Sequence, residues 1–285
     1  FEMVSDRLRI TFFNKLDGII IANPTSLHID SMKKCLKRDT KIFVEKPIAV
    51  SLRQSNEIGK SETSRIMVVF KLRHNEMIKS VRNFIKSKKI GRIYKANLYC
   101  GQYLKSWHPY ADYRKEYYSR KDMGGGVLRT LCHEIDLMHY FFGAPAELTA
   151  DVEKLSEMEI DVDDNVYILC RMKDKHLVSI ELDYFNPIPT RSGAIFASEG
   201  KLIYSLSSFS ESKAFFTGNN GAINKIYENE SLDWNEMYLS QMKEFVEFVE
   251  NGKKPACTFD DGLNVMKVID SAEKSSKLRR WIKLK

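Results

Sequence analysis

The first part of the chain alternates continuous apolar runs with amphipathic stretches. The sequence DGIIIANPTSLH (17–28) contains an unbroken apolar run that a proline ends. Similar runs follow at 41–44 and 66–70, each separated from the one before by enough residues for a helix. Continuous apolar residues are typical of parallel strands that are covered on both faces. The pattern therefore predicts a strand, helix, strand, helix and strand over 17–70, as in a doubly wound parallel sheet.

The helices of this region have small polar residues where they begin. Thr25 or Ser26 is expected to cap the first helix and Ser51 the second, because their side-chain oxygens can accept hydrogen bonds from free backbone amides. A third helix is predicted at 76–86, after the apolar runs have ended.

The pattern changes near residue 72, beyond which strand composition dominates. A strand at 93–103 leads into a polar, aromatic loop, and a helix follows at about 128–142. Further strands are predicted at 146–154, 164–172, 176–185 and 191–205, and closing helices at about 234–250 and 260–277. We therefore expect two domains, 1–72 and 73–285, the second built on a large, mainly antiparallel sheet.

The composition is that of a soluble globular protein. Hydrophobic residues make up 43% of the 285-residue chain and charged residues 29%, and no apolar run is long enough to span a bilayer. The net charge of +7 could indicate a nucleic-acid partner. However, the lysines are scattered among acids and no basic block alternates with stacking aromatics. Neither nucleic acid nor a membrane is therefore expected as a partner.

The cysteines are odd in number and show neither metal-binding nor redox spacing. We expect free, mostly buried thiols in a reducing cytoplasm at Cys35, Cys100, Cys132, Cys170 and Cys257. Residues 1–16 include several charged residues and lack the apolar core of a signal peptide. The histidines have no matching set of partner ligands, so no metal site is expected.

The second predicted strand ends in Glu45-Lys46-Pro47. In an open parallel sheet, ligands bind at the carboxyl ends of the strands. A lysine at such an edge, next to a proline whose φ is fixed, could handle the proton of a substrate hydroxyl or stabilise a developing oxyanion. The alternative is a surface lysine that follows an edge strand.

The helix predicted at 128–142 carries a second candidate, His133, shortly after three glycines at 124–126. Imidazole titrates near neutrality and glycine lets the backbone approach a ligand closely, so this pattern favours proton transfer at a ligand site. Asp136 lies three residues further along the same helical face, where it could orient His133 or bind a hydroxyl. Glu134 is a reserve acid. The alternative is a core histidine in an amphipathic helix.

These motifs, in this order, resemble one family of enzymes. The matching stretches are DGIIIANPTSLH (17–28), VEKPIAVS (44–51), FKLRHN (70–75), KKIGRIY (88–94), GGGVL (124–128), HEID (133–136), ASEGKL (197–202) and YLSQMKEFVEFVENGKKPACTFDDGLNV (238–265). The chain resembles the glucose–fructose oxidoreductase, inositol dehydrogenase and MocA family of NAD(P)-dependent sugar oxidoreductases. The resemblance implies a Rossmann-type domain that binds NAD or NADP, followed by a domain for substrate binding and oligomerisation. It also implies hydride transfer to or from a carbon of a sugar or sugar derivative. The loop before GGGVL resembles a subgroup from bacterial surface-sugar pathways.

The resemblance also assigns roles to residues of this chain. The implied catalytic residues are Lys46, His133 and Asp136. Cofactor contacts are implied for Asn23, Pro24, Thr25, His28, Glu45, Lys46 and Pro47. Substrate contacts are expected from Arg73, Trp107, Lys121 and Asp136. Arg73 could instead lock the two domains together, and the aromatic loop that holds Trp107 and Lys121 could simply pack over the second domain.

Two departures from the family pattern leave a second interpretation open. The family opens with a glycine-rich G-x-G-x-x-G turn that binds pyrophosphate, and this sequence, which starts at Phe1, lacks it. That segment is therefore expected to be missing from this sequence or from the gene. Many relatives have Asp at the position of Thr130, where it takes part in proton transfer or substrate binding. The alternative interpretation is a truncated, non-catalytic relative that binds a sugar-like ligand or a partner.

Alternating apolar positions in two predicted strands indicate a sheet face for association. These positions are Ile168, Cys170 and Met172 in one strand and Ile180, Leu182 and Tyr184 in the next. Such alternation fits an apolar outer face through which two subunits pair. We therefore expect a homodimer or a homotetramer.

Overall fold

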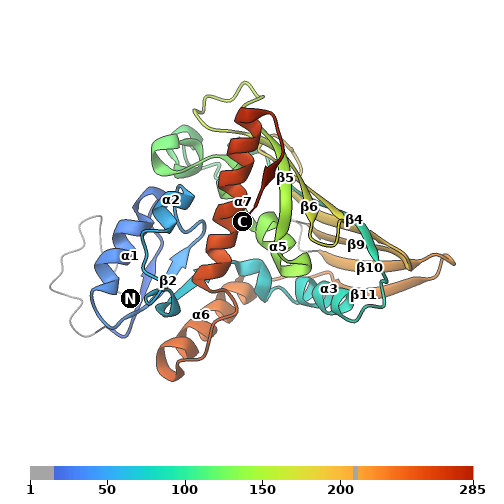
Figure 1. Ribbon diagram of the computed structural model, residues 1–285, viewed down its shortest axis with the longest axis horizontal. Coiled ribbons are helices and arrows are strands. Elements are labelled where there is room, and N and C mark those ends of the chain that lie inside the picture. The colour runs from blue at the N-terminus through green and yellow to red at the C-terminus, as the bar shows by residue number, and fades with distance from the viewer. Residues whose placement is uncertain (1–15, 208–210, 285) are drawn as a thin grey trace.

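The computed structural model describes residues 16–207 and 211–284 and folds them around two sheets (Figure 1). The small N-terminal sheet and a large sheet lie on opposite sides of the long C-terminal helix α7 (Phe259–Leu278). Residues 1–15, which begin the predicted first domain, lie outside the described residues. The division into domains at residue 72 stays a prediction.

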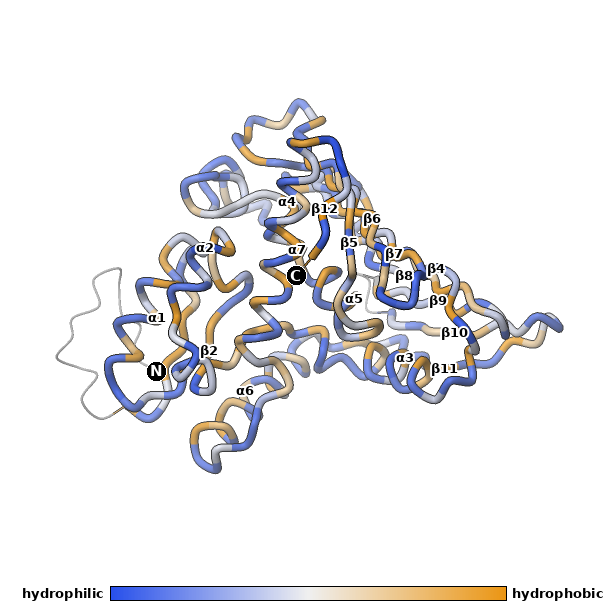
Figure 2. Tube along the Cα trace, in the orientation of Figure 1, coloured by the Kyte–Doolittle hydropathy of each residue, from blue (hydrophilic) through white to orange (hydrophobic). Residues whose placement is uncertain are grey.

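The small sheet consists, among the described residues, of three parallel strands in the order β1-β2-β3. These are β1 (Gly18–Ile21), β2 (Lys41–Glu45) and β3 (Ile66–Val69), connected by α1 (His28–Leu36) and α2 (Leu52–Ser55). The predicted alternation of strand and helix is therefore confirmed. In β2, Ile42 and Val44 pack in the same cluster as residues of α1, while Phe43 packs on α6 (Trp234–Asn251). Figure 2 shows β2 as a hydrophobic segment, whereas α6 alternates between hydrophobic and hydrophilic residues.

The two helix starts of this unit differ in how they are capped. The Ser51 hydroxyl accepts a hydrogen bond from the Gln54 amide at 3.3 Å, so the predicted cap of α2 is confirmed. The predicted cap at Thr25 or Ser26 is wrong, because a 3-10 turn at 25–27 precedes α1 and no side chain caps that helix. Thr25 is instead buried by packing, and a Cβ atom added to Gly124 would lie 3.1 Å from the Thr25 Cβ.

The large sheet consists, among the described residues, of nine strands in the order β11-β10-β9-β8-β4-β7-β6-β5-β12. In chain order these are β4 (Ile93–Gly101), β5 (Pro145–Glu153), β6 (Asn165–Met172), β7 (Leu177–Asp183), β8 (Thr190–Ala197), β9 (Gly200–Ser207), β10 (Ser212–Gly218), β11 (Ile223–Asn229) and β12 (Ile282–Lys283). β4 pairs with β7 in parallel, and the other neighbours are antiparallel. The prediction of a large, mainly antiparallel sheet is confirmed.

The strand predicted at 191–205 is two strands, β8 and β9, which turn at Ser198 and Glu199. The hairpin of β10 and β11 was not predicted, because its sequence is rich in lysine, asparagine and glutamate and weak in apolar alternation. Tertiary contacts compensate for this weak pattern. β10 pairs with β9, and the Phe216 ring of β10 lies 5.0 Å from the Phe84 ring of α3 (Glu76–Lys86).

The helix predicted at 128–142 is divided into α4 (Val127–Thr130) and α5 (His133–Phe142). At the break, the Thr130 carbonyl oxygen accepts a hydrogen bond from Lys46 Nζ at 2.5 Å. That carbonyl is therefore bonded to the residue that follows β2. The start of α4 is held by Asp163, whose Oδ2 accepts a hydrogen bond from the Leu128 amide at 2.8 Å.

The two faces of the large sheet have different environments. α3, α5 and α7 pack against one face (Figure 1). The six residues predicted to form an association face lie in this core, and none is more than 2% exposed: Ile168, Cys170, Met172, Ile180, Leu182 and Tyr184. That prediction of the face is wrong, because the alternation marks the side that the helices cover. The opposite face carries Tyr167 and Ile203, which are 54% and 42% exposed.

The five cysteines are free and buried, as predicted. No helix within 16–207 or 211–284 is long and apolar enough to cross a membrane. Over the same ranges, no group of three or more His, Cys, Asp or Glu side chains is arranged to hold a metal ion.

Candidate active site

A cavity of about 480 Å³ lies where the carboxyl edge of the small sheet faces the large sheet. Its walls come from the ends of β2 and β3, from β4 and β8, from the aromatic loop, from the α4–α5 junction and from α6. The chemically active residues that line it are Glu45, Lys46, Lys71, Trp107, His108, Tyr117, His133 and Arg191. This position agrees with the rule that ligands bind at the carboxyl ends of parallel strands.

Lys46 follows β2 and lies half-buried beside the cavity. Its Nζ donates to the Thr130 carbonyl, and a cis peptide bond joins it to Pro47. Burial disfavours the charged ammonium, but ionisable neighbours led by Cys132 favour it more, so the pKa of Lys46 is raised. Lys46 therefore stays charged at neutral pH and can stabilise negative charge on an oxygen atom in the cavity.

His133 begins α5 and lines the same cavity. Burial, together with the charges of Lys46 and Arg191, lowers the pKa of His133 well below its usual range. Its Nδ1 is buried without a hydrogen-bond partner among the described residues. The imidazole is therefore neutral at neutral pH and can accept a proton. The structure thus brings two of the predicted catalytic residues, Lys46 and His133, to one cavity.

The third predicted catalytic residue, Asp136, does not reach this cavity. Its two carboxylate oxygens accept hydrogen bonds from Arg73, at 3.0 Å from Nε and at 2.6 Å from Nη2. Arg73 also donates to Asp261 at 3.0 Å and to the Ala256 carbonyl at 2.9 Å. These contacts correct the expectation that Asp136 orients His133 or binds a substrate hydroxyl. They favour the alternative in which Arg73 acts as a structural lock between η4 (Lys71–His74), α5 and α7.

Arg191, on β8, was missed by the sequence analysis. Its Nε donates to Glu134 Oε1 at 2.5 Å, and its Nη2 lies 3.2 Å from Cys100 Sγ. Glu134, the reserve acid of the sequence analysis, is fully buried and orients Arg191. No motif marks Arg191, because only the order of the strands places β8 beside β4 and opposite α5.

Lys71 was also missed, although the strand-end rule that identifies Lys46 could have found it. It follows β3 by two residues and lines the cavity. Its ammonium donates to the Tyr238 hydroxyl at 2.8 Å and lies over the rings of Trp234 and Tyr238. These contacts from α6 hold a second lysine at the cavity edge.

The aromatic loop contributes a stacked wall to the cavity. Trp107, which lines the cavity, stacks on Tyr118 at 5.0 Å between ring centroids and on His108 at 6.0 Å. The Trp107 ring also lies 6.3 Å from that of Tyr184, which follows β7, so the loop both packs beside the large sheet and faces the cavity. Lys121 is exposed and is not among the described residues that line the cavity, so the structure does not place it at the substrate.

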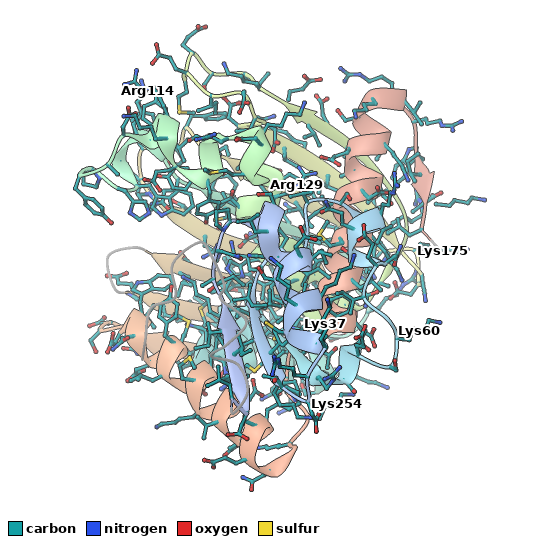
Figure 3. All side chains as sticks on the ribbon, turned by 90° about the vertical axis from the view of Figure 1, so that its left-hand side faces the viewer. Lys37, Lys60, Arg114, Arg129, Lys175 and Lys254 are labelled. Atoms are coloured by element: carbon teal, nitrogen blue, oxygen red, sulfur yellow. The ribbon has the colours of Figure 1, made fainter. Side chains whose placement is uncertain are left out.

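Arg129, in α4 just after the aromatic loop, forms hydrogen bonds with two other parts of the chain. Figure 3 shows Arg114 at the outer end of the loop and Arg129 close to the N-terminal helices. Arg129 bonds the Val50 carbonyl at 3.0 Å and Glu273 of α7 at 2.7 Å. This arginine–glutamate pair lies outside the residues that line the cavity.

The residues predicted to hold the cofactor divide into two groups. Glu45 and its neighbour Lys46 both line the cavity. His28, in contrast, is 1% exposed, and its Nδ1 and Nε2 each lie 2.8 Å from a backbone carbonyl oxygen, of Pro47 and Asn23. Because both ring nitrogens face backbone carbonyl oxygens inside the protein, His28 lies between two strand-end turns and does not present a nitrogen to a ligand. This corrects its predicted cofactor contact.

The fit of a nicotinamide cofactor can be tested at the turn after β1. Asn23, Pro24 and Thr25 form this turn, and the Asn23 Oδ1 atom is buried without a hydrogen-bond partner among the described residues. A carboxamide or a ribose hydroxyl could donate to this oxygen. The strand ends therefore fit the nicotinamide half of NAD or NADP. The described residues include no glycine-rich turn for the pyrophosphate.

Comparisons with known proteins agree with this architecture. A family model described as "Oxidoreductase family, NAD-binding Rossmann fold" matches residues 2–71, and one described as "GFO/IDH/MocA C-terminal domain" matches 78–203. The myo-inositol 2-dehydrogenase of Thermotoga maritima is 24% identical, over 94% of this chain and 80% of that protein. The putative oxidoreductase YteT of Bacillus subtilis is also 24% identical, over 47% of this chain and 32% of that protein.

Among solved structures, a levoglucosan dehydrogenase in complex with NADH has a TM-score of 0.84 to this chain. The two are 19% identical, and the match covers 96% of this chain and 82% of the dehydrogenase. At this identity the likeness shows the fold alone.

Proposed function

Because the chain belongs to the GFO/IDH/MocA family of NAD-binding oxidoreductases, we propose that it catalyses NAD(P)-dependent hydride transfer to or from a carbon of a sugar or sugar derivative. The observation that carries this proposal is the convergence of Lys46 and His133 on one cavity at the carboxyl edge of the small sheet. The names of relatives that act on inositol and levoglucosan support a polyhydroxylated substrate.

The proposed chemistry uses the two residues in complementary protonation states. In the oxidation direction, neutral His133 accepts the proton of the substrate hydroxyl, and the charged ammonium of Lys46 stabilises the negative charge that develops on the oxygen. The carbon–hydrogen bond breaks as a hydride departs, which leaves a carbonyl group. A bound nicotinamide supplies the hydride acceptor or, in the reverse direction, the hydride donor. Asn23, Pro24, Thr25 and Glu45 are the residues proposed to hold it.

The first experiment is a fluorescence titration of NADH and NADPH against the chain, with Lys46→Met as the control. Turnover is then measured on a panel of sugars and cyclitols that includes myo-inositol and levoglucosan. We expect saturable micromolar binding, and turnover that the substitution reduces by about 10²-fold or more. Failure of both nucleotides to bind would reject the oxidoreductase proposal for this chain. The non-catalytic, ligand-binding interpretation would then explain the fold.

Self-association is proposed for the uncovered face of the large sheet. Tyr167 and Ile203 are exposed there, and an extended sheet face with large apolar side chains supports a homodimer or homotetramer. Sedimentation of Tyr167→Glu beside the parent chain tests this, and a parent chain that sediments as a monomer at micromolar concentration would contradict it.

The free thiols support a cytoplasmic location, and a role in surface-sugar metabolism stays a prediction.

A further inference from the structure

The cavity carries more positive than negative charge. Lys46, Lys71 and Arg191 all line it, and they come from three separate elements of the fold. Among the described lining residues, Glu45 is the carboxylate that opposes them. Like charges gathered around a partly enclosed space favour a ligand of the opposite sign. Glu134, which lies behind Arg191, offsets one of these positive charges, and a neutral sugar would offset none of the remainder.

Arg191 is a cation of this cavity that keeps unpaired hydrogen-bond donors. Its guanidinium has five N–H groups in a planar fork, of which Nε is bonded to Glu134 and Nη2 contacts Cys100 Sγ. Nη1 has no hydrogen-bond partner among the described residues, although the side chain lines the cavity. The side chains of Arg191 and Glu134 are 12% and 1% exposed, so their packing fixes the fork before any ligand arrives. A donor group that is ordered in advance binds with little loss of conformational freedom.

The position of Arg191 also separates substrate from cofactor. Lys46 and Lys71 follow strands of the small sheet, which is the edge proposed for the nicotinamide. Arg191 belongs to β8 of the large sheet and faces the cavity from the other side. An anion that meets the free edge of Arg191 therefore belongs to the substrate, since the phosphates of a dinucleotide would lie toward the small sheet.

We propose that Arg191, oriented by Glu134, selects a substrate that carries an anionic group, either a carboxylate or a phosphate, next to the reacting sugar carbon. The inference rests on the proposed function for the identity of the site as an oxidoreductase site. It adds the substrate class, an acidic sugar or a sugar phosphate. Two parallel N–H groups on a planar fork match the geometry of either anion.

The test compares acidic sugars with their neutral parents by equilibrium binding. Trp107 and Trp234 line the cavity, so intrinsic fluorescence reports its occupation. The probes are D-glucose, D-glucuronate and D-glucose 6-phosphate, with D-galactose and D-galacturonate as a second series, each titrated with and without NADH. At least one acid should bind roughly 10-fold or more tightly than its parent. The uronate and phosphate arms show which anion the site prefers.

The variants remove the charge without leaving an unpaired buried partner. The double variant Arg191→Gln/Glu134→Gln should reduce the preference for the acid to within about twofold. Arg191→Lys keeps the charge but loses the fork, and should lose most of the preference. The matched control is Arg129→Gln/Glu273→Gln, which removes a second arginine–glutamate pair outside the cavity and should keep the preference.

The outcomes distinguish this inference from the proposed function. If no acid binds more tightly than its parent, or if both Arg191 variants keep the preference, the inference is overturned. Turnover of neutral sugars without any preference for acids would overturn it while the oxidoreductase function stands. A preference for acids that depends on Arg191, in a chain that binds neither NADH nor NADPH, would uphold the inference and reject the proposed function.

Discussion

Two arginines with side chains only 6% and 12% exposed, Arg73 and Arg191, pair with two carboxylates of helix α5, and the pairs differ in which donors they leave free. Arg73 bonds Asp136, Asp261 and a backbone carbonyl in a cluster that does not line the active-site cavity. Arg191 bonds Glu134 at the cavity wall, and its Nη1 has no partner among the described residues. An enclosed arginine whose three nitrogens are all bonded stabilises the fold, whereas an arginine that keeps one nitrogen unpaired at a cavity wall can also bind a ligand.

The two carboxylates are two positions apart on one helix, so they point to different sides of it. Glu134 points toward β8 and Asp136 toward η4 and α7. One side of α5 therefore faces the cavity, and another side faces the contact between η4 and α7. Substitutions on the two sides should separate effects on activity from effects on stability.

The largest effect is expected on the cavity side, from Lys46→Met. Loss of the ammonium should lower kcat by about 10²- to 10⁴-fold, because the charge that develops on the substrate oxygen loses its stabilising partner. The midpoint of urea unfolding should stay close to that of the parent chain. Steady-state kinetics on the substrate found by the sugar panel measures the first quantity. Normal kcat in a folded Lys46→Met variant would remove Lys46 from the mechanism.

On the Asp136 side of α5, Arg73→Met should lower the stability of the fold. Asp136 and Asp261 would lose their shared guanidinium, and an uncompensated buried carboxylate should lower the free energy of unfolding by about 3–5 kcal/mol. Urea denaturation measures this change. Adding Asp136→Asn to the variant should recover part of the loss. A stable Arg73→Met variant with a greatly raised KM would instead restore the substrate-binding role predicted from the sequence.

Acidification should weaken the fold through the histidines of α5. Burial lowers the pKa of His139 from its usual value to about 4. The unfolded chain therefore binds a proton near pH 6.5 that the folded chain binds only near pH 4, and stability falls as the pH decreases through this window. His139 alone should account for roughly 2 kcal/mol between pH 7 and pH 5.

The contribution of His139 is isolated by difference. Urea unfolding at pH 7 and pH 5 should show a smaller loss for His139→Gln than for the parent chain. His133, whose pKa burial also lowers, contributes in the same direction and should remain in the variant. Equal losses in the two chains would show that His139 titrates alike in the folded and unfolded states.

The smallest effect is expected from Lys71→Met, also on the cavity side. Lys71 is partly exposed and is held by a hydroxyl and two aromatic rings, so its removal should change the free energy of unfolding by less than about 1 kcal/mol. KM for the substrate should rise by about three- to tenfold, since one cation of the cavity is lost. An unchanged KM would restrict substrate recognition to Arg191 and Lys46.

Local sequence patterns determined much of the framework. Continuous apolar runs identified the three parallel strands, because a strand covered on both faces has no polar side. The strand-end rule identified Lys46, since the end of a parallel strand is fixed by where the apolar run stops. The three glycines and the histidine after them identified the segment that opens α5. These signals are local, so a single sequence is enough to recognise them.

The tertiary structure alone decided which of these residues meet. Asp136 and His133 lie on one helix, yet the aspartate pairs with Arg73, 63 positions away in the sequence, and leaves the imidazole without it. Arg191 reaches Glu134 across 57 positions, because the sheet places β8 beside β4. Whether the alternating residues of β6 and β7 face helices or solvent was likewise set by the helices that pack against them. A pattern of alternation gives two faces of a strand, and only packing decides which one is buried.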